Sequence, residues 1–160
     1  MTSTSFRDGV PYVGGIGQDI ARGILPVASV FDTDPSNLKY ITDGDIGSVS
    51  GTGETALGAA ANYGMLELDF GIEKAVQICT YMTAWSLANT HLTLYCDVWD
   101  GSAFQYGGQA LYSVTSTIER RLAIPVQFAS TQKIRFRLYA AGADTFYAKF
   151  YEILALEVLP

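Results

Sequence analysis

Charged residues, histidine and cysteine are all scarce in this 160-residue sequence. Charged side chains make up 16% of it, well below the share of about 25% in an average soluble domain. Acidic residues outnumber basic ones and give a net charge of −6, so the sequence lacks the basic patch on which nucleic acids or an anionic membrane would dock. One histidine and no Cys-x-x-Cys pair also argue against a zinc site. We therefore expect no nucleic acid, membrane or zinc ion among the partners.

Motifs that mark catalysis or export are missing as well. The sequence contains no Gly-x-Ser-x-Gly nucleophile elbow and no phosphate-binding loop that ends in Gly-Lys-Ser/Thr. His91 could act as a general base with Asp97 or Asp100, but nothing places a nucleophile beside it. No apolar run reaches the ~18 residues of a membrane span, and the first residues lack the pattern of a signal peptide. These absences predict a non-enzymatic protein with no signal peptide and no transmembrane segment.

Aromatic residues and glycine are abundant, and their pattern is that of a β protein. The chain has eight Phe, ten Tyr, two Trp and sixteen Gly, a mixture that favours sheet over helix. Apolar and polar residues alternate in short segments separated by turn residues, as in half-buried strands. The predicted strands are residues 27–31, 65–70, 75–82, 92–99, 104–106, 110–114, 122–128, 134–138 and 146–159. We therefore predict an all-β fold, an antiparallel jelly-roll β-sandwich over residues 27–160.

Residues 1–26 differ from the rest and are predicted to form an extended N-terminal arm. They contain five glycines and two prolines and show no sustained period of 2 or 3.6 residues. Only residues 18–24 could form a turn or two of helix. The arm nevertheless carries apolar side chains, among them Phe6, Tyr12 and Ile20, so it packs either across its own domain or on a neighbouring subunit. We expect none of residues 1–26 to be buried in the protein's own core, and we predict that these side chains contact a neighbouring subunit.

The two cysteines fall on different faces of the predicted strands. Cys96 shares a face with Leu94 and Val98, which are expected in the core, whereas Cys79 alternates with Val76 and Ile78. Side chains on opposite faces of a sheet cannot meet. We therefore predict two free, half-buried thiols rather than a disulfide.

Four segments, taken in order, resemble a known family. They are the loop DGDIGS at residues 43–48, the strand LELDFG at 66–71, the hairpin LYCDVWDGSAF at 94–104 and the strand KIRFR at 133–137. Through these segments, residues 24–160 resemble discoidin-type domains, the galactose-binding-like jelly rolls of the coagulation-factor type C family. The resemblance implies the same sandwich fold and permits a carbohydrate ligand.

The resemblance also raises the question of calcium. In the family's bacterial sugar-binding members a glutamate of the closing strand is often a calcium ligand, and Ala155 stands at that position here. Asp43, Asp45 and Ser48 could supply oxygen atoms to a calcium ion, which needs about six to eight. The alternative is that Asp43 and Asp45 cap a tight turn. We predict no required cofactor and leave calcium at these three residues open.

Trp85, Asn89 and His91 lie close together between two well-defined predicted strands. Sugar sites often combine an aromatic ring with amide and imidazole groups that form hydrogen bonds, so the three residues are a candidate ligand site. The alternative is structural: Trp85 would plug the end of the sandwich and His91 would be a solvated loop residue.

Arg135, Arg137 and Tyr147 are predicted on the outside of the sandwich, either as solvated surface or as part of an interface. Exposed arginine and tyrosine are enriched at interfaces. Together with the arm, they predict a structural or assembly protein that forms homo-oligomers. We expect a bacteriophage virion component, either a capsid decoration (cement) protein or a neck or tail accessory protein, assembled in the host cytoplasm. The alternative function is a carbohydrate-binding, lectin-like module with a glycan partner.

Overall fold

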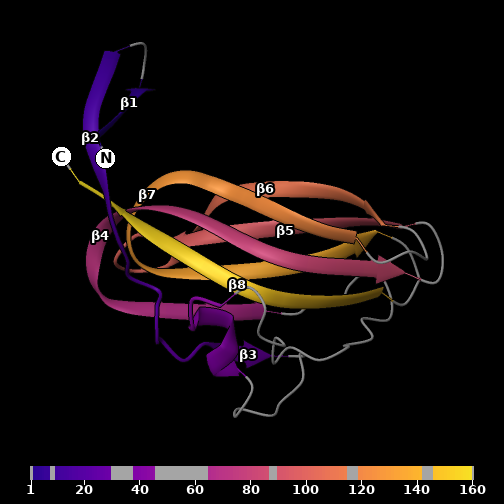
Figure 1. Ribbon diagram of the computed structural model, residues 1–160. Helices are drawn as coiled ribbons and strands as arrows, with labels where there is room; N and C mark the ends of the chain where they lie inside the picture. The colour runs from indigo at the N-terminus through magenta and orange to yellow at the C-terminus, as the bar shows by residue number, and fades with distance from the viewer. Residues whose placement is uncertain are drawn as a thin grey trace.

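The structure, a computed structural model, describes residues 2–7, 10–29, 38–45, 65–86, 90–114, 119–141 and 146–159. These ranges contain eight strands and one 3-10 helix, in the order β1 (Thr2–Arg7), β2 (Val10–Asp19), β3 (Val27–Ser29), η1 (Lys39–Thr42), β4 (Met65–Ser86), β5 (Thr90–Trp99), β6 (Phe104–Val114), β7 (Glu119–Ala141) and β8 (Phe146–Val158). All paired strands are antiparallel. The predicted all-β, antiparallel fold is confirmed (Figure 1).

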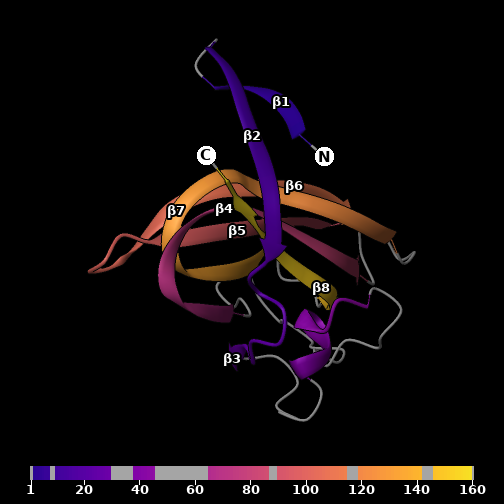
Figure 2. The ribbon, with the colours of Figure 1, turned by 60° about the vertical axis from the view of Figure 1, so that its left-hand side comes forward.

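The strands form two layers, and two long strands belong to both of them (Figures 1 and 2). β4 has 22 residues, β7 has 23, and the two pair along most of their lengths. Residues 65–70 of β4 and 133–141 of β7 lie in layer I with β3, β5 and β6. Residues 74–86 of β4 and 119–131 of β7 lie in layer II with β8, β2 and β1.

Gly71 and Thr131 mark the places where the two long strands pass from one layer to the other. Gly71 has φ +77°, a conformation that favours glycine. Its N–H donates to Asp69 Oδ1 at 2.8 Å, and this bond, with others from Gln132 and Lys133, lowers the pKa of Asp69. The buried hydroxyl of Thr131 bonds the backbone of Trp99 and Lys133 at 2.7–3.2 Å. Both bends are therefore fixed by local hydrogen bonds.

The core lies between the layers and follows the predicted alternation. Phe136 of layer I is 1% exposed, and its ring lies 5.9 Å from that of Phe150 in layer II. The core side chains include Leu66, Leu68, Leu94, Cys96, Ile134, Phe136 and Leu138 from layer I, and Val76, Ile78, Met82, Phe150, Ile153 and Ala155 from layer II. Residues 122–128 pair only with β4 among the described strands, and such an edge position suits the proline that they contain, Pro125.

Both cysteines are free thiols, as predicted, but both are buried rather than half-buried. Cys96 is fully buried in the core, and Cys79 is buried on the opposite face of its strand, where Asp19 and Glu152 lie nearby. Burial raises the pKa of both thiols. Neither has the lowered pKa that marks a reactive cysteine.

The N-terminal region, predicted as an arm without a strand pattern, contains two strands. β1 and β2 form a hairpin that projects away from the sandwich (Figures 1 and 2). β2 reaches layer II only near its end, where Ile16 and Asp19 pair with β8. The arm predicted from the sequence thus contains two strands that the sequence did not indicate, and residues 18–24, where a turn or two of helix was possible, form a strand end followed by a turn.

Residues 19–26 belong to the sandwich itself. Ala21 is fully buried, Ile20 and Ile24 pack against the core, and the N–H of Ala155 donates to Asp19 Oδ1 at 2.9 Å. This corrects the expectation that nothing in residues 1–26 is buried in the protein's own core. Because Ile20 packs against the core, less of its surface is available for the predicted contact with a neighbouring subunit.

Candidate functional site

The candidate ligand residues Trp85 and His91 lie at one end of the sandwich. Trp85 is the last but one residue of β4 and pairs with Tyr147, near the start of β8. His91 is the second residue of β5 and pairs with Ala141, the last residue of β7. The backbone therefore brings the two to the same end, on either side of the segment that joins β4 to β5. Asn89, the third member, lies outside the described residues.

The loop after η1 carries the residues considered for calcium. The N–H of Asp45 donates to Asp43 Oδ1 at 2.8 Å, which is the turn-capping arrangement given as the alternative. Ser48 lies outside the described residues. Over the described ranges, no group of three or more His, Cys, Asp or Glu side chains is arranged to hold a metal ion. Calcium at this loop, which the sequence left open, is not tested by the described residues.

Glu152 of β8 faces this loop and was not singled out from the sequence. Its Oε2 accepts a hydrogen bond from the Gly44 N–H at 3.1 Å, while its buried Oε1 has no hydrogen-bond partner among the described residues. Burial, with Asp43 and Asp19 nearby, raises the pKa of Glu152 to about 7. β8 has a register shift opposite Tyr81 and Met82, and such irregularities are hard to read from one sequence.

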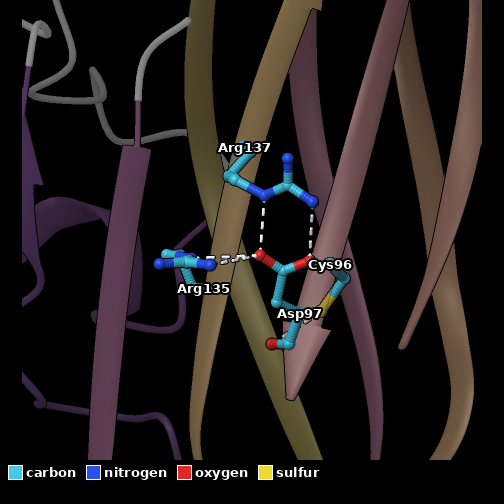
Figure 3. A network of polar contacts seen from close by, with 4 residues as sticks. All are labelled: Cys96, Asp97, Arg135 and Arg137. Atoms are coloured by element: carbon cyan, nitrogen blue, oxygen red, sulfur yellow. Dashed lines mark hydrogen bonds and ion pairs between the residues drawn. The ribbon is translucent and has the colours of Figure 1, made fainter. Parts of the chain in front are cut away.

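Asp97 of β5 holds two arginines of β7 on the outer face of layer I (Figure 3). Arg135 donates from Nε and Nη2 to Asp97 Oδ2 at 3.0 and 2.8 Å. Arg137 donates from Nε to Oδ2 at 2.6 Å and from Nη2 to Oδ1 at 2.8 Å. The Asp97 side chain is only 4% exposed. Burial alone would raise the pKa of this carboxyl, but the bonds from Arg137 and Arg135 outweigh it and lower the pKa.

Each cation of this face also lies over an aromatic ring. Lys133 Nζ is 5.3 Å from the Trp99 ring centroid, and the Arg135 guanidinium carbon is 4.4 Å from that of Phe104. Arg137 lies 4.8 Å from the ring of Tyr95. Such cation–π pairs fix the orientation of both partners. We call the whole set, Tyr95, Trp99, Phe104, Tyr106, Lys133, Arg135 and Arg137 around Asp97, the cation–ring face.

A groove of about 240 Å³ adjoins this face beside β3. Its apolar wall includes Leu25 and Val27, which are 57% and 71% exposed, and its polar side includes Glu67, Asp69 and Lys133. Lys133 Nζ pairs with Asp69 at 3.1 Å, so this lysine connects the groove to the cation–ring face. None of the described residues that line the groove is aromatic.

The predicted interface residues are spread over the molecule. Arg135 and Arg137 point away from the core, as expected, but they are bound to Asp97 rather than simply solvated. Phe6 and Tyr12 lie in the projecting hairpin, and Tyr147 lies in β8 at the end where β4 finishes. These residues do not form one surface in this chain, and their contact with another subunit stays a prediction.

Comparison with known proteins finds similarity in fold only. No family model matches the chain, and no curated protein is detectably similar in sequence. Chitosan-binding module 1 of a chitosanase/glucanase from Paenibacillus sp. IK-5 matches with a TM-score of 0.55 at 12% identity, over 86% of this chain and 98% of the module. The family 32 carbohydrate-binding module of C. perfringens NanJ, solved with galactose, matches with a TM-score of 0.56 at 13% identity, over 84% of this chain and 94% of the module. A pectin-binding module matches with a TM-score of 0.51 at 14% identity, over 87% of this chain and 91% of the module.

The chain therefore has the galactose-binding-like β-sandwich fold of these carbohydrate-binding modules. At such low identities the likeness concerns the fold and not the ligand. Nothing among these structures supports the finer expectations of a discoidin-type domain or a bacteriophage component. In the part of the chain that the structure covers, no helix is long and apolar enough to cross a membrane.

Proposed function

We propose that this chain is a non-enzymatic carbohydrate-binding module whose sugar site lies at the end of the sandwich where β4 finishes and β5 begins. One observation carries the proposal: the strand ends bring Trp85 and His91 to this end, flanking the segment that contains Asn89. An indole for stacking, with amide and imidazole groups for hydrogen bonds, is a set that suits a sugar. The similar solved structures lend support, because each is named for binding chitosan, galactose or pectin.

The test is a glycan screen followed by substitutions at the proposed site. The chain should retain one or more glycans, and Trp85→Ala and His91→Ala should each weaken retention by about tenfold, which corresponds to about 1.4 kcal/mol. The matched control is Ile72→Ala, since Ile72 is an exposed apolar residue of the same strand, beside the bend at the opposite end of the sandwich. Binding that the first two variants leave unchanged would move the site elsewhere, and no binding to any glycan would refute the module.

A separate feature supports a second role, attachment to another protein. The β1–β2 hairpin projects from layer II, and β1 pairs only with β2 among the described strands. A two-stranded hairpin alone is marginally stable in water, and its outer edge offers backbone groups to a further strand. We propose that this hairpin contacts a partner subunit. A bacteriophage particle as the place of assembly is a prediction from the sequence alone.

A further inference from the structure

The cation–ring face has the composition of a recognition surface for an acidic sugar. We propose that it binds a polysaccharide rich in uronic acid, through the sugar carboxylates and through stacking on Tyr106. This inference rests on the proposed carbohydrate-binding function and adds a second site with its own class of ligand, at a place distinct from the end that carries Trp85 and His91.

The first argument is the row of cations. Lys133, Arg135 and Arg137 alternate with buried residues along β7, so they point to the same side at intervals of about 6.6 Å. A row of cations on one side of a strand attracts a polymer that carries a carboxylate on each sugar unit. The row stands out because the chain as a whole has a net charge of −6.

The second argument is charge balance around Asp97. Two guanidinium groups converge on this single acid, which holds both of them side by side on the outer face of the layer. Arg135 uses Nε and Nη2 for the same oxygen of Asp97, and in the described part of the chain it has no other hydrogen-bond acceptor, so Nη1 faces no acceptor there. Guanidinium groups bind carboxylates well because they are planar and always charged.

The third argument is an exposed ring beside these cations. Tyr106 lies on the edge strand β6, pairs with Asp97 in the β5–β6 register and is 63% exposed. Its ring contacts that of Tyr95 edge to face at a centroid distance of 6.4 Å, which fixes its orientation. An exposed ring held in place next to a guanidinium can stack on a sugar whose carboxylate meets the cation.

Glu67 provides a further test, because its negative charge repels an anionic ligand. It pairs with Arg135 across β4 and β7 and lies in the groove beside Lys133. Glu67→Gln removes a negative charge next to the proposed path and should strengthen binding to an acidic polysaccharide by about threefold, or about 0.6 kcal/mol. The same substitution should leave binding to neutral glycans unchanged.

The experiment compares polygalacturonate with a neutral galactan on the full chain, by affinity electrophoresis at low and high salt. We expect polygalacturonate to be retained and salt to weaken retention. Tyr106→Ala should weaken it by about tenfold or about 1.4 kcal/mol, while Ile72→Ala, another exposed apolar residue, should not. Polygalacturonate binding that is absent, or that neither Tyr106→Ala nor Glu67→Gln alters, overturns this inference. If a neutral glycan is still bound through Trp85 and His91, the carbohydrate-binding function stands; if no glycan is bound at all, both fail.

Discussion

Asp97 binds two arginines with one carboxylate. Replacing the acid should therefore lower the free energy of unfolding by a different amount than replacing one arginine. Asp97→Ala leaves both guanidinium groups without their shared acceptor and should lower the free energy of unfolding by about 3 kcal/mol. Arg135→Ala should cost less, about 1–2 kcal/mol, because Asp97 keeps both bonds from Arg137. Urea unfolding of the two variants measures the difference.

Phe136→Ala gives the scale for this comparison. Phe136 is a core residue, and its truncation should cost about 3–5 kcal/mol. The sequence placed Arg135 on the outside of the sandwich, and the structure adds its two bonds to Asp97, which make Arg135→Ala more costly than the loss of a solvated side chain. A loss for Arg135→Ala as large as that for Asp97→Ala would show that Arg137 cannot hold the acid alone.

Glu152 makes stability depend on pH near neutrality. Its pKa is about 7 in the folded chain against an ordinary value of 4.5, so the folded state binds the proton more tightly than the unfolded state. Stability should therefore fall as pH rises from about 4.5 to 7. Glu152→Gln keeps an acceptor for Gly44 but carries no charge, and at pH 8 it should be more stable than the unmodified protein by about 1–2 kcal/mol. Thermal unfolding at pH 5 and pH 8 tests this, and equal pH slopes for both proteins would contradict it.

Single residues of the sites were only partly predictable. The alternation in β7 correctly indicated that Arg135 and Arg137 point outward, because facing follows from a period of two. Their partner could not be predicted, since the position of Asp97 opposite them depends on the register between β5 and β7. Glu152 was missed for the same kind of reason, because a register shift in β8 decides where it lies.

At the scale of elements, most of the predicted strands were correct in place, but several were fragments of longer strands, and β1 and β2 were not predicted. Segments 65–70 and 75–82 are one strand, β4, and segments 122–128 and 134–138 are one strand, β7. The sequence interrupts both at residues that resemble turns, and Gly71 is one of them. At Gly71 a bend and a turn look alike in sequence, because each can use a glycine in a positive φ conformation.

The N-terminal region has two parts that meet at Ile16: the projecting hairpin before it and the segment that packs on the sandwich after it. Two truncations should separate their contributions to stability. Removing residues 1–15 deletes β1 and the projecting part of β2 and should change the free energy of unfolding by less than about 0.5 kcal/mol. Removing residues 1–26 also deletes buried Ala21 and the Asp19 bond to Ala155, and should cost about 3 kcal/mol or more. Thermal unfolding of both chains measures the contrast.

The shorter truncation also tests attachment through the hairpin. If the hairpin contacts a second copy, native mass spectrometry should find an oligomer for the full chain and a monomer without residues 1–15. A full chain that is already monomeric would exclude self-association, and an unchanged oligomer after truncation would place the contact elsewhere.

At the scale of the whole molecule, the architecture was the most predictable property and the ligand the least. Many alternating segments, each a weak signal, add up to a sandwich because every one must bury an apolar face. A ligand depends instead on a few side chains whose meeting is set by strand register and by the segments between strands. Trp85 and His91 could be named from the sequence because they flank one such segment, whereas the cation–ring face joins residues of three strands.

The passage of β4 and β7 through both layers has a consequence for how the protein comes apart. Neither layer can detach while the other stays intact, since the same two hydrogen-bonded strands carry part of each. Heating should therefore give a single calorimetric transition whose van't Hoff enthalpy equals the measured enthalpy. Amide protons of residues 65–69 and of residues 76–84 should exchange with solvent at one common rate, set by global opening. The two layers thus unfold together, and a ligand that binds and stabilises either layer slows the unfolding of the whole molecule.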